Sequence, residues 1–117
     1  MVQSFAASLQ EQGLEKGDRV ALMLLNCPPY IISYYGILLA GGMVAQVNPL
    51  LFDKELAHIL IDSGSKTIVI YEPLLPVLHA IIDQTEIEHV IVVRLGENEA
   101  KHDQAVDFET FLKKATP

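Results

Sequence analysis

The sequence predicts an α/β fold in which a parallel sheet of about four strands alternates with helices. Short aliphatic runs that suit buried strands begin near residues 19, 43, 67 and 89, and a helical pattern fills each interval. Most of these runs are continuously apolar, as expected when both faces of a sheet are covered. Regular alternation of strand and helix produces parallel pairing with right-handed crossovers. The chain has 117 residues, so it forms one domain at most.

The stretch from 17 to 52 organises the rest of the chain. Positions 20–52 contain no Asp, Glu, Lys, Arg or His. A membrane-spanning helix needs about 20 unbroken apolar residues. Here Asn26, the Pro28–Pro29 pair, the Gly41–Gly42 pair and Pro49 interrupt the run. The stretch is therefore predicted to be a buried strand–helix–strand unit and not a transmembrane segment.

The first half of the chain is predicted to form two helices and two strands. Gly13 suits the left-handed conformation beyond a helix C-terminus, and Pro28 suits the first turn of the next helix. Gly41–Gly42 ends that helix, and Pro49 ends the second strand. The predicted elements are a helix before Gly13 with Val2, Phe5, Ala6 and Leu9 on one face, a strand over 19–25, a helix in which Ile31, Tyr34, Tyr35 and Leu38 recur at helical spacing, and a strand over 43–47.

The second half is predicted to repeat this alternation and to end in a helix. Asp53 suits the N-cap of a third helix that Gly64 closes, and Pro73 opens a fourth helix. Residues 94–106 are polar and aperiodic and are predicted to be a loop, and Asp107 then caps the final helix. The predicted elements are a helix with Leu56, Ile59 and Leu60 buried, a strand over 67–71, a helix carrying Leu75, Leu78 and Ile82, a strand over 89–93, and an amphipathic helix with Phe108, Phe111, Leu112 and Ala115 in register.

Composition limits the partners of the chain. Half of it is hydrophobic, so either both sheet faces are covered or an apolar surface awaits a partner. The net charge of −7 and the lack of a Lys/Arg cluster exclude nucleic acid and anionic membrane surfaces as expected partners. Cys27 is the single cysteine, so an internal disulfide is impossible. With no signal peptide visible at the N-terminus, these features indicate a cytoplasmic protein.

The ready-made binding motifs of a parallel α/β fold are missing. Ligands of such sheets bind outside the C-terminal ends of the strands. The sequence has no Gly-x-Gly-x-x-Gly turn after its first strand, no Gly-x-x-x-x-Gly-Lys-Ser/Thr loop, and no acidic set of a phospho-receiver domain. The residues predicted at the C-terminal ends of the strands are Asn26, Cys27, Pro28, Asn48, Pro49, Glu72, Pro73 and Arg94.

Single residues do not supply a catalytic set either. Cys27 precedes a predicted helix N-terminus, an environment that activates thiols, but no His lies near it in sequence, so an inert, partly buried thiol is the favoured interpretation. Tyr34–Tyr35 is more typical of core and rim than of a stacking platform, Ser63–Ser65 of a helix terminus, and Asn48 of a turn. We therefore predict no catalytic, cofactor-binding or metal-binding residue in this chain. The histidines, which show no metal-ligand spacing, are His58, His79, His89 and His102.

The motifs of the organising stretch resemble those of the AMP-forming acyl-CoA synthetases, within the wider adenylate-forming family. Members share a Gly-Asp-Arg-Val-Ala strand start, Asn-x-Pro before a helix, an Ala-Gly-Gly helix end, Asn-Pro after the next strand, and Asp-Ser-Gly-x-Lys before another. MVAQVNPL resembles the long-chain fatty acid branch in particular, although many members carry Pro where this chain has Gln46. The corresponding residues here are Gly17–Ala21, Asn26 with Pro28, Gly36–Gly42, Asn48–Pro49, Glu55–Leu56, and Asp62–Gly64 with Lys66.

The resemblance implies a two-step reaction in a parent enzyme. A fatty acid carboxylate attacks Mg-ATP and expels pyrophosphate, and the thiol of coenzyme A then attacks the acyl adenylate and releases AMP. Magnesium and cationic side chains stabilise charge on the transferring phosphate in such chemistry. ATP, Mg²⁺ and coenzyme A are therefore cofactors or substrates implied for the parent enzyme, and the fatty acid is its acyl substrate.

The chain departs from the family in what it lacks. The Ser/Thr-Gly-rich loop ending in Pro-Lys-Gly, the Tyr-Gly-x-Thr-Glu and Thr-Gly-Asp segments, and the C-terminal domain with the adenylation lysine are all absent. Residues 1–117 are therefore expected to be a partial domain, a piece of the N-terminal subdomain that is structural, inactive alone, partnered by the remainder of the enzyme, and prone to self-associate. Two alternatives stay open: a standalone α/β binding or scaffold module, and an unrelated flavodoxin-like protein that binds a small ligand.

Overall fold

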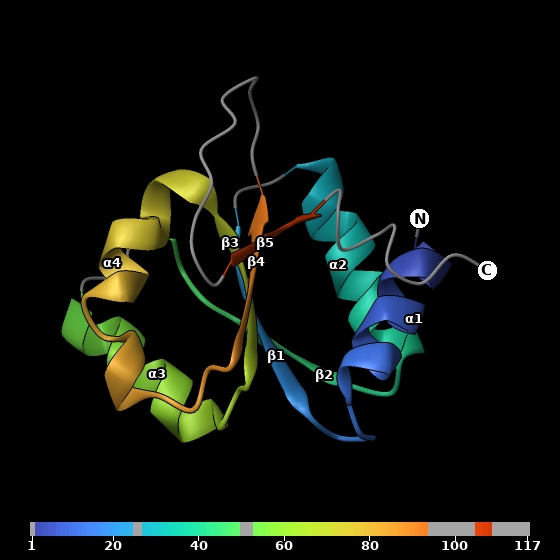
Figure 1. The fold of residues 1–117 in the computed structure, drawn as a ribbon, viewed down its shortest axis with the longest axis horizontal. Coiled ribbons are helices and arrows are strands. Elements are labelled where there is room, and N and C mark those ends of the chain that lie inside the picture. The colour runs from blue at the N-terminus through green and yellow to red at the C-terminus, as the bar shows by residue number, and fades with distance from the viewer. Residues whose placement is uncertain (1, 25–26, 50–52, 94–104, 109–117) are drawn as a thin grey trace.

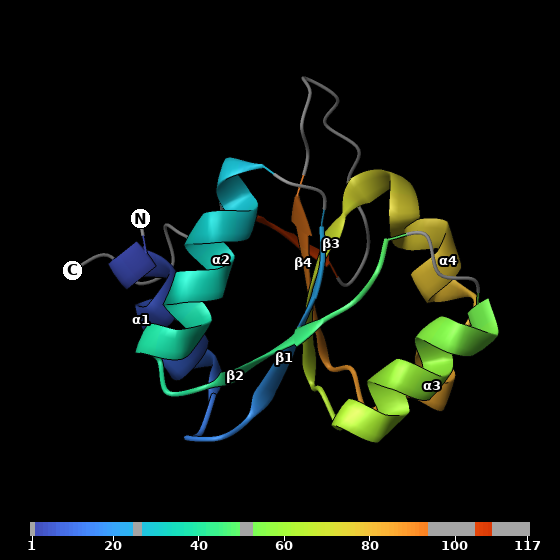
Figure 2. The ribbon, with the colours of Figure 1, turned by 180° about the vertical axis from the view of Figure 1, so that it is seen from behind.

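The computed structural model describes residues 2–24, 27–49, 53–93 and 105–108, which form three layers (Figure 1). Two helices cover one face of a central sheet and two cover the other, as both views show (Figures 1 and 2). The helices are α1 (Val2–Gln12) and α2 (Pro28–Leu39) on one face, and α3 (Asp53–Ser63) and α4 (Leu75–His79) on the other.

The sheet is wholly parallel and has the strand order β2-β1-β3-β4-β5. Its centre is the β1–β3 pair, in which Ala21 lies opposite Ile68. The predicted fold class is confirmed, because the four predicted strands are all present and all parallel. The strands are β1 (Arg19–Met23), β2 (Met43–Gln46), β3 (Thr67–Tyr71), β4 (His89–Val93) and the short β5 (Ala105–Asp107).

Two hydrophobic cores lie on the two faces of the sheet. Successive strand residues point to opposite faces, so β1 sends Val20 and Leu22 to the α1–α2 side and Ala21 and Met23 to the α3–α4 side. The continuously apolar strands are thus explained by burial on both faces. The helical residues of the first core include Phe5, Leu9 and Ile37, and those of the second include Leu56, Leu60, Leu75 and Leu78.

Most of the predicted helix boundaries are confirmed. Gly13 follows α1 with a φ of 108°, and Gly64 follows α3 with a φ of 63°, both in the left-handed region that glycine adopts without a steric cost. Pro28 is the first residue of α2, as predicted. Asp53 is the first residue of α3, whereas the sequence predicted it as the N-cap just before this helix. None of the helices among the described residues has the length and apolarity to cross a membrane.

The fourth helix was predicted as one continuous helix, but the structure divides it into three short pieces. A 3₁₀ turn (Glu72–Leu74), the five-residue α4 and a second 3₁₀ turn (Ile82–Gln84) replace it. Pro76 lacks the N–H that would extend a helical hydrogen-bond ladder from the preceding turn, which separates α4 from the first 3₁₀ turn, whereas no proline lies between α4 and the second 3₁₀ turn. The predicted apolar face is still used, since Leu75 and Leu78 are buried.

The predicted loop over 94–106 is wrong at its C-terminal end, whereas Phe108, directly after the predicted Asp107 cap, is helical. Residues 105–107 form β5 and pair in parallel with β4, where Asp107 lies opposite Val92. Parallel pairing with a buried neighbour compensates for the weak local strand signal of this segment. Phe108 is buried against Phe5, with ring centroids 5.7 Å apart. Residues 94–104 and the predicted helix beyond 108 lie outside the described residues.

Candidate functional site

The C-terminal edge of the sheet is where a ligand site is expected. The chain leaves β1 toward the α1–α2 layer and leaves β3 toward the α3–α4 layer, and ligands of open parallel sheets bind outside such a pair of strand ends. Cys27 follows β1, Asn48 follows β2, and Glu72 follows β3. Asn26 and Arg94, also predicted at this edge, lie outside the described residues. The described groups are therefore a thiol, an amide and a carboxylate, accompanied by prolines.

Cys27 occupies the N-cap position of α2. Its backbone is extended, with φ −159° and ψ 163°, and its side chain makes no capping hydrogen bond. The thiol-bearing residue is half-buried, in keeping with the inert thiol favoured from sequence. Nearby, the Gln46 Nε2 donates a 2.7 Å hydrogen bond to the Tyr30 hydroxyl, which joins the end of β2 to the start of α2. This hydrogen bond links the two elements, but its amide and hydroxyl groups do not form a nucleophile and base pair.

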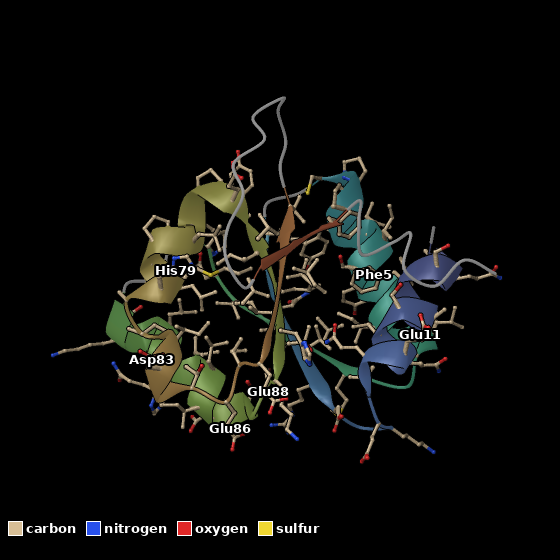
Figure 3. All side chains as sticks on the ribbon, viewed as in Figure 1. Phe5, Glu11, His79, Asp83, Glu86 and Glu88 are labelled. Atoms are coloured by element: carbon tan, nitrogen blue, oxygen red, sulfur yellow. The ribbon has the colours of Figure 1, made fainter. Side chains whose placement is uncertain are left out.

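The histidines are dispersed over separate elements. His58 lies on the exposed face of α3, where its Nε2 is 3.3 Å from an Asp62 carboxylate oxygen. His79 ends α4 on the outer side of the molecule (Figure 3), and His89 begins β4 at the opposite end of the sheet from Cys27. The described part of the chain brings no three His, Cys, Asp or Glu side chains together as metal ligands. His102 lies outside that part.

A polar cavity of about 180 Å³ lies at the N-terminal edge of the sheet, the edge opposite to the expected ligand site. It is formed where the end of α1 and the end of α3 meet the starts of β1, β3 and β4 (Figure 3 shows Glu88 at this end). Side chains of both signs line it, among them Glu15, Asp18, Arg19, Lys66 and Glu88. This cavity has no local signal in the sequence, because its residues come from the ends of separate helices, turns and strands.

Hydrogen bonds at this edge fasten the turns to the strands. The Gln12 Nε2 donates to the Thr67 hydroxyl at 2.9 Å, which joins α1 to β3. The Arg19 guanidinium donates to the Ser63 carbonyl at 3.2 Å, which joins the start of β1 to the end of α3. The Lys66 carbonyl accepts the N–H groups of Glu88 and His89 at 2.7 and 3.0 Å. The first two bonds join helix ends to strand starts, and the Lys66 bonds join the segments that lead into the neighbouring strands β3 and β4.

The family-like motifs Gly-Asp-Arg and Ala-Gly-Gly meet in the same network. The Gly17 N–H donates to the Gly41 carbonyl, and the Met43 N–H donates to the Asp18 carbonyl, both at 2.8 Å. The Asp18 carboxylate accepts the Glu15 N–H at 2.9 Å and closes the turn before β1. These motif residues therefore have structural roles. They hydrogen-bond the turns to one another and to the strands, at the edge of the sheet where parallel sheets do not bind ligands.

The site residues do not fit an adenylating centre. Phosphate binding requires a glycine-rich loop or helix N-terminus with cationic side chains, and magnesium requires several oxygen ligands. The sequence contains no phosphate-binding loop. At the described C-terminal edge, Glu72 is the acidic side chain, and Cys27, Asn48 and the adjoining prolines add no positive charge. We therefore derive no step of ATP chemistry from this chain.

The fold is an α/β fold with a parallel sheet, and comparison with known proteins gives the family of the chain. The family model described as "AMP-binding enzyme" matches residues 1–116. The chain belongs to the AMP-binding enzyme family.

Individual relatives carry the name long-chain-fatty-acid–CoA ligase. One from Escherichia coli O6:H1 is 47% identical over 95 residues, which cover 80% of this chain and 17% of that ligase. One from Yersinia pestis is 42% identical over 117 residues, covering 97% of this chain and 21% of that ligase. The chain thus spans about a fifth of the length of these curated relatives.

A solved structure agrees with both fold and family. The crystal structure of a long-chain-fatty-acid–CoA ligase from Archaeoglobus fulgidus superposes with a TM-score of 0.76 at 28% identity. The match covers 82% of this chain and 19% of that protein. The resemblance inferred from the motifs is confirmed.

Proposed function

We propose that this chain is a structural piece of the N-terminal subdomain of an ATP-dependent long-chain fatty acid–CoA ligase. The observation that supports this most is the family match over residues 1–116 combined with relatives of which the chain spans only 17–21%. In the whole enzyme, the fatty acid, ATP, Mg²⁺ and coenzyme A are bound by segments that this sequence lacks. The lone cysteine agrees with a reducing cytoplasm, where we place the enzyme.

The role proposed for the segment is architectural. Its five parallel strands form a wall whose two faces are already packed by their own helices. Such a wall gives the substrate-binding segments a rigid surface on which to fold. Because the described side chains form no catalytic set, the 117-residue chain alone is expected to be inactive. It is also expected to self-associate through the apolar surface that it exposes to solvent.

Pyrophosphate exchange tests the proposed inactivity. The purified 117-residue chain is incubated with Mg-ATP, labelled pyrophosphate and a long-chain fatty acid, beside the E. coli ligase as a positive control. We expect no labelled ATP above background from the chain alone, since the sequence has no phosphate-binding loop. Fatty-acid-dependent exchange by the chain alone would contradict the proposal.

The natural gene distinguishes the ligase proposal from a standalone scaffold. A reading frame that continues into a Ser/Thr-Gly-rich loop ending in Pro-Lys-Gly agrees with the ligase. A stop codon directly after Pro117 would favour a self-contained α/β module, which retains the family fold without adenylation machinery.

A further inference from the structure

The helix α2 is apolar on all sides. Its sequence, PPYIISYYGILL, contains no charged residue. One side is buried against α1 and the sheet through Ser33, Gly36 and Ile37. The other side is solvent-exposed although it is equally apolar. The exposed residues, with their exposed fractions, are Ile31 (57%), Tyr35 (56%), Leu38 (48%) and Leu39 (58%).

These four residues form one continuous stripe. Their spacing is i, i+4, i+7 and i+8, which places side chains on a single helical face. On α3, by contrast, the solvent side carries Lys54, Glu55, His58 and Asp62, and Ile61 is the large apolar residue exposed there. A helix that is hydrophobic all round belongs in the interior of a larger protein.

The strand β2 places an open edge of the sheet beside α2. It pairs with β1 on one side, and no described strand pairs with its other side. Its sequence, Met43 to Gln46, has none of the charges or prolines with which natural edges avoid pairing, and Met43 is 51% exposed. α2 contacts β2, and Figure 2 shows both on the near side of the molecule. Together the exposed α2 stripe of Ile31, Tyr35, Leu38 and Leu39 and the unpaired edge of β2 are called the α2–β2 face.

The length of the relatives indicates what covers this face. They extend far beyond the matched segment, which is only 17–21% of their chains. The α2–β2 face is uncharged on a chain of net charge −7, so its complement is an apolar surface and not a basic one. Resting on the proposed function, we propose that the α2–β2 face is the surface onto which the remainder of the acyl-CoA ligase packs.

The test compares one substitution in two contexts. The 117-residue chain is expressed alone and also within the E. coli ligase, in place of the segment that it matches. At a concentration low enough to keep the isolated chain monomeric, Tyr35→Glu is expected to leave its Tm within about 2 °C, because the side chain is solvent-exposed in the monomer. In the full-length chimera the same carboxylate would be buried, and the Tm should fall by about 5 °C or more, with loss of soluble yield.

Ile61→Glu is the matched control. Ile61 is 51% exposed and lies on α3, in the opposite layer, so its substitution should change the Tm in neither context. An unchanged chimera Tm with Tyr35→Glu would overturn the proposal, as would an equal loss with Ile61→Glu. If the chimera does not fold, the E. coli ligase with Glu at the residue aligned to Tyr35 gives the same comparison, and its Tm supports or overturns the proposal in the same way.

The two proposals fail in different ways. Fatty-acid-dependent pyrophosphate exchange by the unsubstituted chimera tests the ligase assignment. An active chimera that tolerates Tyr35→Glu keeps that assignment and rejects the α2–β2 face. A substitution that is silent in the chimera but abolishes self-association of the isolated chain would identify a second copy as the occupant and overturn the proposal.

Discussion

At the residue scale, one buried hydroxyl is a source of instability. Ser33 on α2 is completely buried, and its Oγ makes no hydrogen bond to any described residue. A buried hydroxyl without a partner retains its desolvation cost, and Ala is the better helix former. We expect Ser33→Ala to raise the free energy of unfolding by about 1 kcal/mol, measured by urea denaturation.

Ser65 provides the opposite case for comparison. It is also completely buried, but its Oγ lies 2.7 Å from the Ser63 Oγ, and the Ser65 N–H donates to the same Ser63 oxygen at 3.3 Å. Removing a satisfied hydroxyl breaks a hydrogen bond, so Ser65→Ala should lower the free energy of unfolding by about 1 kcal/mol. Effects of the same sign at Ser33 and Ser65 would show that hydrogen bonding does not decide these two positions.

Sequence reasoning is accurate where backbone chemistry dictates the structure of a residue. Gly13 and Gly64 follow helices because only glycine adopts a positive φ at little cost, and this requirement is visible locally. The burial of Ser33 was not visible. The helical spacing that indicated α2 came from Ile31, Tyr34, Tyr35 and Leu38, of which only Tyr34 is partly buried, whereas the fully buried positions of the helix include small residues. An all-apolar helix gives no local signal for which side is buried.

At the element scale, Gly36 sets the distance between α1 and α2. A Cβ at Gly36 would lie 2.6 Å from Phe5 Cδ1 and 3.0 Å from Phe5 Cβ. The Phe5 ring packs against Phe108 on another side, so it has little room to retreat. Gly36→Ala should therefore lower the free energy of unfolding by about 1–2 kcal/mol, even though Ala is favoured in a helix.

A double-mutant cycle tests this explanation. Phe5→Leu removes the ring that the new methyl group would meet. The cost of Gly36→Ala should be smaller in the Phe5→Leu background than in the original chain, with a coupling above about 0.5 kcal/mol. Additive costs, measured by the same urea denaturation, would mean that the loss arises elsewhere than in the α1–α2 contact.

Elements also differ in how far the sequence predicts them. The strands β1, β3 and β4 were predicted because aliphatic residues buried on both faces give a strong local signal. The helix after β3 was predicted as continuous, but Pro76 separates α4 from the 3₁₀ turn before it, and a second 3₁₀ turn follows α4. β5 was missed because its strand conformation depends on pairing with β4, which no local pattern reveals.

At the scale of the whole molecule, the described motifs that identified the family lie mainly at the N-terminal edge of the sheet, whereas parallel sheets bind their ligands at the C-terminal edge. The Gly-Asp-Arg and Asp-Ser-Gly motifs identified the family, yet Arg19 and Ser63 meet at the N-terminal edge and fasten the sheet. The C-terminal edge, where parallel sheets bind their ligands, carries Cys27, Asn48 and Glu72, and the described residues there form no catalytic arrangement. The segment could be assigned to an enzyme family from residues that maintain its fold, and for the same reason it reveals no active site.

The isolated chain should self-associate through the α2–β2 face, and this follows from what the whole molecule leaves uncovered. With no partner present, four large apolar residues of one helix face water beside an open strand edge. The weight-average sedimentation coefficient of the 117-residue chain should rise with its concentration, and the chain should enhance the fluorescence of an apolar dye. Tyr35→Glu should reduce both effects, because it places a charge in the stripe, whereas Ile61→Glu should reduce neither. If the chain stays monomeric and does not enhance the dye fluorescence at high concentration, the expectation of self-association through this face is wrong.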